Sequence, residues 1–397
     1  MSVQTAVVLA AGEGRRLRPL TRTRPKPMLP AADRPILEHV LNALVDAGIR
    51  HIVLVVGYRH ERVQEYFGSS YRNIRLQYVF QEKQLGSGHA LLQAREAVDE
   101  PLVVVNGDRV IEANAVRDVI NAFEHGTAAA TMAVLEGRDT TQYGAVTLHG
   151  RDVAELVEKP DTDEYRLING GIYAFGPSIF HAIEETSRTE GELALPDTIA
   201  RILETDRIRG TLTGGLWIDA TYPWDLLKIA DEVLARGRVA EPEKREGVWI
   251  HDHVTVHGDA TLRAPVVIGS DCEIGPGAVI GPAVALGRNV TVGPNTTIDR
   301  SVIDIDGRVE AGSTVRDAVV GGDVHLGVDS TIPGGPSDVR VDSEVHESRQ
   351  LGAVVADRAR TEGGVSFDPG TLVGPNVHVG PGAHISGTIR DGTEVVC

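Results

Sequence analysis

A six-residue repeat dominates the second half of the chain. From residue 250 an apolar residue recurs every six positions without a break, and glycine follows it at 269, 275, 281, 287 and 293. A period of six places one short strand and one turn on each side of a triangular coil, with apolar side chains inside and small residues closing the turns. The repeat therefore predicts a left-handed parallel β-helix. Its inward positions are Ile250, Val256, Leu262, Ile268, Ile274, Ile280, Leu286, Val292 and Ile298.

The repeat is interrupted once. Its frame slips near Asp304 and resumes at Phe367, Val373, Val379 and Ile385. We expect the intervening stretch SDVRVDSEVHESRQLGAVVADRARTEGG to form loops that interrupt the coil. Coils of this kind commonly pack side by side, so we expect a homotrimer or a higher oligomer through this region.

The first half of the chain has a different texture, in which short apolar runs alternate with amphipathic stretches. This alternation favours an α/β domain with a mostly parallel sheet, whose ligands bind at the carboxyl ends of the strands. The expected strands are 6–10, 52–56, 75–80, 102–106, 128–134, 144–148 and 170–175, and the expected helices are 36–47, 87–97, 115–124, 177–185 and 223–236. We expect a domain at 1–236, a charged linker at 237–247 and the β-helix at 248–397.

Composition limits the class of protein. The chain carries 56 acidic and 39 basic residues, a formal charge of −17, and only five of its basic residues are lysines. This balance fits a surface adapted to high salt, or equally an acidic enzyme from a GC-rich genome. No basic stripe suggests a nucleic-acid partner, and no apolar run approaches the roughly 20 residues of a membrane span. With no signal peptide and two cysteines lacking metal-ligand spacing, we expect a cytoplasmic protein.

One loop is strongly basic, in contrast to the acidic composition of the whole chain. LAAGEGRRLRPLTRTRPKPMLP, residues 9–30, holds five arginines and Lys26 directly after an apolar run. It lacks the G-x-x-x-x-G-K-[ST] spacing of a P-loop, and Leu17 stands where a dinucleotide fingerprint needs its third glycine. The remaining interpretation is a loop that wraps a nucleoside triphosphate, with glycines for close approach and cations for phosphates.

This loop resembles the signature of the sugar-1-phosphate nucleotidyltransferases. The motifs QEKQLGSGHA (81–90), NGD (106–108), YG (143–144), VEKP (157–160), NGGIY (169–173) and WID (217–219) follow in the family's order. The layout resembles archaeal relatives of N-acetylglucosamine-1-phosphate uridylyltransferase and glucose-1-phosphate thymidylyltransferase. The resemblance implies Mg²⁺-dependent transfer of a nucleotidyl group from UTP or dTTP to glucose-1-phosphate or N-acetylglucosamine-1-phosphate, with release of pyrophosphate.

The same resemblance assigns the catalytic residues. Arg16 matches the arginine that grips the triphosphate, and Lys26 matches a lysine that meets phosphate oxygens. Asp108 and Asp219 match the two carboxylates that hold Mg²⁺, a cation that prefers hard oxygen ligands. Their structural alternatives are a turn residue in NGDR and a helix-entry acid. No individual role is assigned to the other arginines of the loop, which are Arg15, Arg18, Arg22 and Arg24.

Further positions match the family's substrate contacts. Gln81 is expected to read the pyrimidine, because an amide can accept from ring N3–H and donate to a ring carbonyl, and a surface glutamine is the alternative. The expected nucleotide-binding residues are Ala11, Gly12, Gly14, Gln81, Gly86 and Ser87. The expected sugar-phosphate-binding residues are Gly144, Glu158, Lys159 and Asn169. For these, a strand-edge charge pair at 158–159 and a turn at 169–170 are the structural alternatives.

A second activity is less well supported. Bifunctional relatives acetylate glucosamine-1-phosphate from acetyl-CoA with a basic histidine, but Ala311 stands where that histidine is expected and VDSTIPGGPSD (328–338) replaces the family's pattern. His325, His378 and His384 remain, and a histidine on a β-helix strand is more often structural or solvent-facing. We therefore predict that acetyl transfer is lost. The bifunctional enzyme and a non-catalytic regulatory subunit stay open as alternatives.

Overall fold

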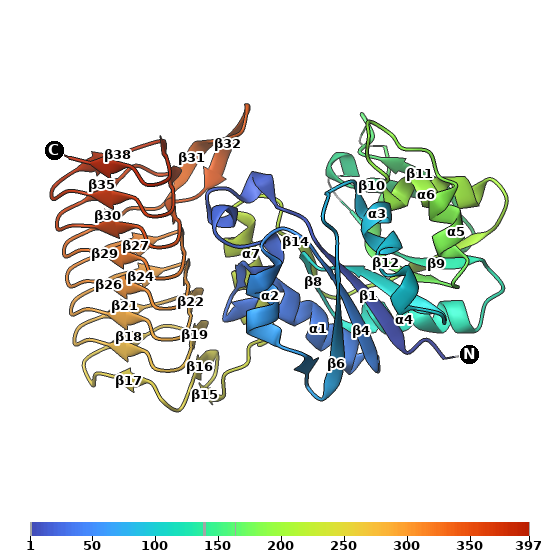
Figure 1. Cartoon of the computed structure of the whole chain (residues 1–397). Coiled ribbons are helices and arrows are strands. Elements are labelled where there is room, and N and C mark those ends of the chain that lie inside the picture. The colour runs from blue at the N-terminus through green and yellow to red at the C-terminus, as the bar shows by residue number, and fades with distance from the viewer. Residues whose placement is uncertain (1, 138–139, 163, 397) are drawn as a thin grey trace. The chain divides into compact units, whose positions relative to one another are not determined.

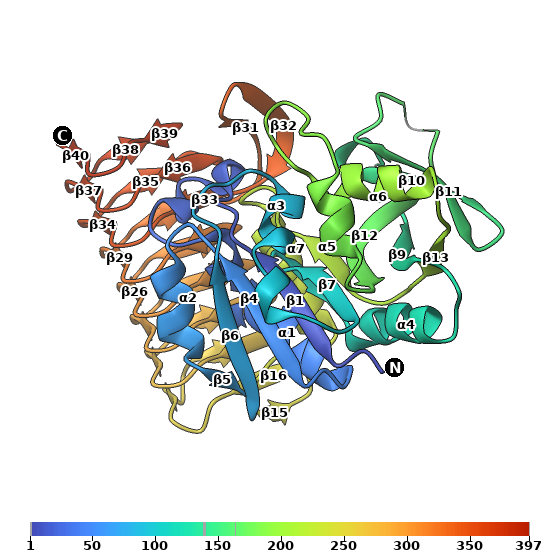
Figure 2. The same ribbon diagram turned by 45° about the vertical axis from the view of Figure 1, so that its right-hand side comes forward.

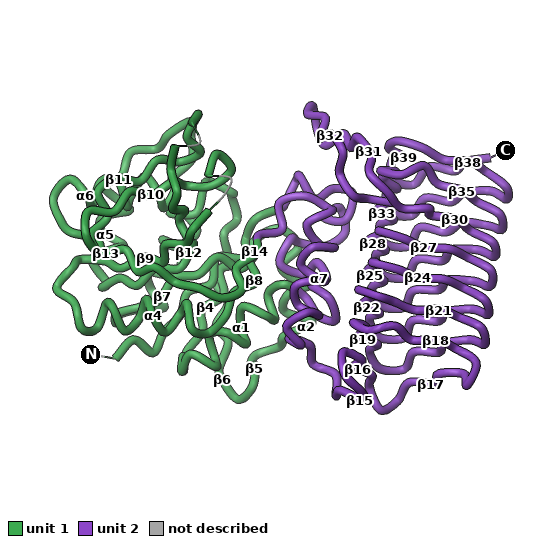
Figure 3. The backbone as a smooth tube through the Cα atoms, turned by 180° about the vertical axis from the view of Figure 1, so that it is seen from behind, with its two compact units in different colours: residues 1–13, 36–218 green, residues 14–35, 219–397 purple. Residues whose placement is uncertain are grey.

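The computed structural model describes residues 2–137, 140–162 and 164–396. The chain divides into two compact units, and neither is continuous in sequence (Figure 3). The first unit comprises Met1–Glu13 and Ile36–Ile218, and the second comprises Gly14–Pro35 and Asp219–Cys397. Most of the signature loop therefore belongs to the compact unit that contains the repeats, so these units divide the chain differently from the domains expected at 1–236 and 248–397.

The first unit is built on one sheet of ten strands. Their order is β10-β11-β13-β9-β12-β7-β1-β4-β6-β5, while β8 and β14 pair separately. The strands are β1 (Thr5–Ala10), β4 (His51–Val56), β5 (Ser70–Tyr71), β6 (Ile74–Phe80), β7 (Leu102–Asn106), β8 (Arg109–Ile111), β9 (Ala130–Glu136), β10 (Gly144–His149), β11 (Asp152–Glu158), β12 (Leu167–Phe175), β13 (Ile208–Leu212) and β14 (Trp217–Asp219).

Parallel pairing is concentrated in one half of the sheet, and in the other half β13 and β9 form a parallel pair among antiparallel neighbours. Strands β7, β1, β4 and β6 run parallel and lie side by side (Figure 2). Strand β12 is antiparallel to both of its neighbours, and β10 and β11 form an antiparallel hairpin. The expectation of a mostly parallel sheet is therefore wrong for the second half. The turn between β10 and β11 is too short for anything but an antiparallel connection.

The first unit also contains helices, most of which lie where the sequence predicts them. They are α1 (Ile36–Asp46), α2 (His60–Phe67), α3 (Ser87–Leu92), α4 (Ala113–Glu124), α5 (Ile179–Glu184) and α6 (Leu195–Leu203). The helix expected over 87–97 ends at Leu92 and is followed by a 3-10 turn at Arg95–Ala97. Sequence analysis missed α2, which is mostly polar, and α6, which has a proline in its first turn, where proline is tolerated. No helix in the described ranges is long and apolar enough to cross a bilayer.

The second unit contains the predicted β-helix, drawn as stacked short strands in Figure 1. Its strands form three parallel sheets, and β15 (Glu243–Arg245), within the expected linker, pairs antiparallel at the edge of the first. The first sheet holds β16 (Val248–Ile250), β19 (Val266–Ile268), β22 (Val284–Leu286), β25 (Ser301–Ile303), β28 (Ala318–Val320), β33 (Ala353–Val355), β36 (Thr371–Val373) and β39 (Thr388–Ile389).

The other two sheets consist mostly of two-residue strands. The second holds β17 (Thr255–Val256), β20 (Glu273–Ile274), β23 (Thr291–Val292), β26 (Arg308–Val309), β29 (His325–Leu326), β34 (Arg360–Thr361), β37 (His378–Val379) and β40 (Glu394–Val395). The third holds β18 (Thr261–Leu262), β21 (Val279–Ile280), β24 (Thr297–Asp299), β27 (Thr314–Arg316), β30 (Thr331–Ile332), β35 (Ser366–Phe367) and β38 (His384–Ile385). All nine predicted inward residues lie in these strands and pack in or against the core of the coil.

The register explains the slip in the repeat. Val266 pairs with Val284, eighteen residues on, but Val284 pairs with Ser301, seventeen residues on. One residue is lost from the turn just before the predicted slip near Asp304. The stretch expected to form loops is only partly a loop. It contributes to the hairpin of β31 (Pro336–Val341) and β32 (Glu344–Gln350), after which the coil resumes at β33.

One face of the coil is covered by other parts of the same unit. Helix α7 (Asp225–Ala235) packs on β22, β25 and β28, and also on β2 (Pro30–Ala31). Strand β2 pairs with β3 (Arg34–Pro35) at the end of the signature loop. The outward-facing Ala285, Val302 and Val319 are accordingly fully buried. This face of the coil therefore serves as a packing surface for α7.

The inward repeat should dominate the stability of the coil. Ile298 is fully buried in the coil, whereas its neighbour Thr297 in the same strand is only partly buried. We expect Ile298→Ala to lower the free energy of unfolding by about 2–5 kcal/mol because it leaves a cavity. Thr297→Ala is the matched control and should change it by less than about 1 kcal/mol. Denaturant unfolding measures both, and equal losses would contradict the inward assignment.

Candidate active site

In the first unit, the carboxyl ends of the parallel strands gather several predicted residues. The backbone N–H of Gly107 donates to the Leu9 carbonyl at 2.9 Å. A Cβ added at Gly107 would lie 2.9 Å from the Cβ of Ala10, so only glycine allows this turn to pack so closely. The NGD turn, with Asp108 next in the chain, therefore lies at the end of β1, where the signature loop begins.

The same edge of the sheet holds Ala11. Its carbonyl accepts a hydrogen bond from Gln84 Nε2 at 3.2 Å. At the adjacent Gly12, an added Cβ would meet nothing within 4 Å, so the space beside this glycine is open. An open edge at the carboxyl ends of parallel strands is where α/β proteins bind ligands.

Gln81 lies just beyond β6 and is buried, which excludes the surface alternative. Its amide Nε2 donates to the Gly86 carbonyl at 3.1 Å and lies 3.0 Å from His89 Nδ1. Both amide N–H groups are thereby engaged. In this arrangement Gln81 offers a base its Oε1, a hydrogen-bond acceptor, and the donation expected from sequence needs a different orientation.

Gly86 and Ser87 are held by a segment far along the chain. Gly86 has φ +97°, and an added Cβ would lie 2.5 Å from the Leu193 carbonyl oxygen. The Ser87 hydroxyl accepts a hydrogen bond from Leu195 N at 2.9 Å. The glycine is thus required for packing, and contact of this backbone with a base stays a prediction.

At the expected sugar end, Gly144 faces Glu158 across β10 and β11. An added Cβ at Gly144 would lie 2.9 Å from Glu158 Oε2, so glycine leaves room for this exposed carboxylate. The following residue, Lys159, has φ +45°, which is unfavourable for a side-chain-bearing residue, and its N–H donates to the Tyr143 carbonyl at 3.1 Å. Backbone strain of this kind clusters at functional sites.

Asn169 is engaged within its own strand. Its Nδ2 donates to the Tyr173 hydroxyl at 2.7 Å, and its Oδ1 accepts from Gly171 N at 3.0 Å. The register of β12 shifts between Asn169 and Tyr173. Asn169 therefore lies in a strand with a shifted register and not in the turn given as its alternative, and a sugar contact stays a prediction.

Sequence analysis missed a cluster around Trp217. The indole N–H donates to the Gly170 carbonyl at 2.7 Å, and the Tyr143 ring lies 5.3 Å from the Trp217 ring. The Arg109 guanidinium lies 5.0 Å from the same ring, within the range of a cation–π contact. Each of these residues stands in or beside a recognised motif, and that adjacency is the feature that could have indicated them.

In the second unit, the signature loop folds around Lys26. Its Nζ donates to Asp219 Oδ1 at 3.1 Å, and both side chains are largely buried. Gly14 has φ +71°, and an added Cβ would lie 2.7 Å from the Cβ of Lys26. The Thr21 hydroxyl closes the loop by donating to the Gly14 carbonyl at 2.9 Å. Gly14 is therefore a steric requirement for the position of Lys26.

Arg16 is exposed, and its guanidinium lies 5.9 Å from the centre of the Tyr222 ring. That ring stacks on Trp224 at 4.8 Å and contacts the buried His346 of the β31–β32 hairpin at 4.4 Å. Sequence analysis missed this aromatic cluster as well, because His346 lies 124 residues beyond Tyr222 in the chain. The exposed cation is available to an anionic ligand.

The two carboxylates predicted to hold Mg²⁺ belong to different units, Asp108 to the first and Asp219 to the second. Over the ranges that the structure describes, no three His, Cys, Asp or Glu side chains gather as a metal cage. Mg²⁺ usually takes one or two carboxylates together with substrate phosphates, so the oxygen ligands of either residue are chemically suited to it.

Comparison with known proteins identifies the family. Residues 5–236 match the nucleotidyl transferase family, and residues 262–361 match the GMPPB C-terminal domain. The chain belongs to the nucleotidyl transferase family. This assignment confirms the enzyme class that the signature loop predicts.

Some relatives of this nucleotidyl transferase match nearly its full length, and others match its first part. The chain is 36% identical to the "Bifunctional protein GlmU" of Methanococcus maripaludis, over 98% of this chain and 96% of that protein. It is 35% identical to the "UTP--glucose-1-phosphate uridylyltransferase AglF" of Haloferax volcanii, over 55% of this chain and 92% of that protein. A UDP-glucose pyrophosphorylase solved with UDP-glucose shares the fold, with a TM-score of 0.54 and 22% identity over 60% of this chain and all of the other.

His89 makes the orientation of Gln81 sensitive to pH. Burial lowers the pKa of His89, with a smaller contribution from the charge of Arg188, so the imidazole is neutral at pH 7 and can accept from Gln81. Protonation of His89 would make Nδ1 a hydrogen-bond donor that faces the donating amide of Gln81, so this hydrogen bond would be lost. We therefore expect the nucleotide KM to be constant above pH 7 and to rise roughly five- to ten-fold as the pH falls below the His89 pKa.

Initial rates across pH 5–8 measure this effect. His89→Asn keeps a neutral acceptor near the position of Nδ1 and should flatten the profile. A variant with the same pH dependence as the wild type would contradict the role of His89.

Proposed function

We propose that the protein transfers a uridylyl or thymidylyl group from UTP or dTTP to glucose-1-phosphate or N-acetylglucosamine-1-phosphate in a Mg²⁺-dependent reaction. The observation that carries this proposal is the buried pair of Lys26, from the loop whose sequence resembles the family signature, and Asp219, from the WID motif. A lysine held beside a carboxylate, with an exposed arginine on the same loop, is a set of charges suited to a triphosphate and a divalent cation.

In the proposed reaction, an oxygen of the sugar 1-phosphate attacks the α-phosphorus of the nucleotide. A new P–O bond forms, the bond to the β-phosphate oxygen breaks, and pyrophosphate leaves. The attacking oxygen is already anionic, so the protein needs no general base. Its task is to neutralise charge and to align two phosphates that repel each other.

The residues of the chain divide this task. Lys26 and Arg16 supply positive charge to the triphosphate, and Asp108 with Asp219 would hold Mg²⁺, which neutralises phosphate charge when bound. The open space at Gly12 would let the phosphates approach the backbone. The strained Lys159, next to the exposed Glu158, would face the sugar phosphate.

The base would be read chiefly by an acceptor. Gln81 Oε1 can accept from N3–H of uracil or thymine, whereas cytosine carries no hydrogen at N3. The two permitted bases differ only by a methyl group, so both nucleotides belong to the proposal. The relative named as a UTP--glucose-1-phosphate uridylyltransferase favours uridine and glucose-1-phosphate. N-acetylglucosamine-1-phosphate stays in the proposal through the family resemblance.

A panel of nucleotides and sugar phosphates tests the proposal. Mg²⁺-dependent pyrophosphate release is expected with UTP or dTTP, and no comparable release is expected with CTP. Measurements at low and high salt cover both interpretations of the acidic composition. Absence of release with every pair would refute the proposal and favour a non-catalytic subunit of the same fold.

Lys26→Arg is the sharpest substitution in the loop. It keeps the charge, but a broad guanidinium has to fit against Gly14 and Asp219 in a buried site. We expect kcat/KM to fall by about a hundred-fold or more, by analogy with the loss of a positioned electrostatic group. Lys244→Arg is the control, because Lys244 pairs with Asp252 at an exposed site. Near-normal turnover of Lys26→Arg would show that this position needs only a positive charge.

The same panel tests a second activity. His325, His378 and His384 lie at the surface of the coil, each within 3.3 Å of a carboxylate, as expected for solvent-facing residues. We propose that acetyl transfer is lost, as Ala311 suggests. Release of CoA from acetyl-CoA and glucosamine-1-phosphate would instead show a bifunctional enzyme, in line with the names of the full-length relatives.

A further inference from the structure

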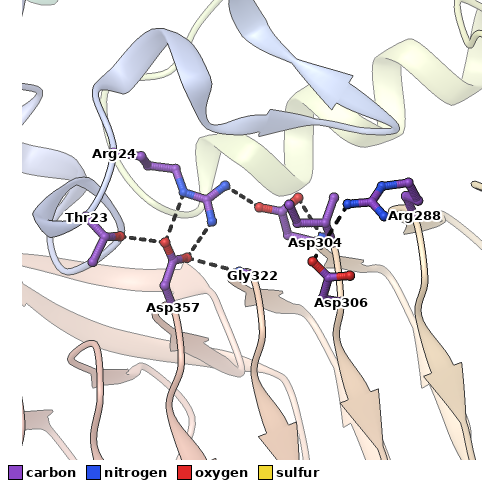
Figure 4. Close-up of polar contacts among 8 residues, drawn as sticks. Thr23, Arg24, Arg288, Asp304, Asp306, Gly322 and Asp357 are labelled. Atoms are coloured by element: carbon purple, nitrogen blue, oxygen red, sulfur yellow. Dashed lines mark hydrogen bonds and ion pairs between the residues drawn. The ribbon is translucent and has the colours of Figure 1, made fainter. Parts of the chain in front are cut away.

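Arg24 of the signature loop is bound by two carboxylates of the β-helix, although sequence analysis gives it no role. Its Nη1 donates to Asp304, and its Nη2 donates to Asp357 Oδ1 at 2.5 Å (Figure 4). Its Nε donates to Asp357 Oδ2 at 3.3 Å, and the Arg24 side chain is only 15% exposed. One guanidinium thus bridges two different turns of the coil.

The two carboxylates are oriented by the coil itself. Asp304 Oδ1 accepts from Ile305 N at 2.8 Å, and Asp357 Oδ1 accepts from Gly322 N at 3.0 Å. Asp304 directly follows its strand, at the place where Gly287 follows the preceding strand of the same sheet. A Cβ added at Gly322 would lie 3.0 Å from Arg24 Nη2. The coil therefore holds two carboxylates in fixed positions and leaves room between them for a guanidinium group.

Electrostatics make this contact strong. Burial alone would lower the pKa of Arg24, but the charges of Asp304 and Asp357 and their hydrogen bonds to the guanidinium together outweigh burial and raise this pKa. Arg24 therefore remains a cation wherever the protein is folded. Removing one member of such a buried set leaves the others without compensation, which is strongly unfavourable.

We call the contact of Arg24 with Asp304 and Asp357 the anchor. Arg24 lies two residues before Lys26 in the chain. The intervening Pro25 has a fixed φ, and a residue that precedes a proline is itself restricted. Lys26–Met28 then forms a 3-10 turn that contains a second proline. Thr23, on the other side of Arg24, donates its hydroxyl to Asp357 Oδ2 at 2.6 Å. Fixing Arg24 on the coil thus fixes the backbone that carries Lys26.

From these contacts we infer that Arg24 is a positioning residue for the nucleotide, through which the β-helix holds Lys26 where the triphosphate binds. This inference rests on the proposed function. Breaking the anchor should weaken nucleotide binding more than sugar-phosphate binding, because the anchored segment carries the triphosphate contacts.

Asp357→Asn and Arg24→Ala test the anchor by steady-state kinetics. We expect Asp357→Asn to raise the nucleotide KM about ten-fold, with the sugar-phosphate KM changed by less than about two-fold. The double variant should be little worse than the more severe single one, because both substitutions break the same contact. A nucleotide KM within two-fold of wild type in both single variants would overturn the inference.

Two controls separate positioning from general damage. Arg22 on the same loop pairs with Asp391 of the same coil at 3.4 Å, but both side chains are half exposed, so Asp391→Asn should leave both KM values unchanged. Ile298→Ala destabilises the coil without touching the loop. If it raises the nucleotide KM as Asp357→Asn does, the anchor is merely structural and the inference is wrong.

Hydrogen exchange tests the anchor without relying on activity. Peptides covering residues 14–29 should exchange faster in Asp357→Asn than in wild type or Asp391→Asn, while peptides of the strands of the coil should not. Unchanged exchange would overturn the inference even in an active enzyme. If the wild type transfers no nucleotide, the proposed function fails and the positioning role fails with it, while the exchange data still report whether the anchor exists.

Discussion

Charge repulsion within the signature loop is the constraint on which the rest of the architecture depends. Six cations lie between residues 15 and 26, with no acid among them. Such a segment can be held compactly without its ligand only if anions from elsewhere balance it. For three of these cations the anions come from beyond residue 218, because Asp219 pairs with Lys26, Asp304 and Asp357 with Arg24, and Asp391 with Arg22. This balance explains why residues 14–35 belong to the compact unit of the β-helix rather than to that of the strand before them.

The coil illustrates how much of a fold local sequence can predict. Ile298 and the other inward residues can be predicted from periodicity alone, because the six-residue repeat specifies which side chain of each strand faces inward. The repeat gives Val302 and Val319 outward positions like those on the uncovered faces of the coil, yet these two side chains are buried where α7 packs on their strands. Periodicity contains no information about which face another element covers. The half-antiparallel sheet of the first unit was unpredictable for a related reason, since strand direction depends on connections that the alternation of runs does not specify.

The candidate site shows a similar limit. Resemblance to a family indicates positions such as Gln81 and Asn169, but it does not indicate what their side chains contact. Gln81 proves to be buried and oriented by His89, whereas Asn169 is engaged with Tyr173 and Gly171. Arg22 and Arg24 are a clearer case still, because they are the same residue type two positions apart. What distinguishes the exposed Arg22 pair from the buried Arg24 contact is the set of carboxylates that distant turns of the coil bring to each arginine.

The same geometry bears on how copies of the chain could associate. The face of the coil formed by β22, β25 and β28 is covered by α7, so it is not available to another chain. An oligomer formed by the coil would have to avoid the strands under α7, and the outward residues of the other two sheets include Thr297 and Arg308. Assembly and the anchoring of the signature loop would therefore use different faces of one coil. Through its contacts with the signature loop, the β-helix would have a role in this enzyme even if acetyl transfer is lost.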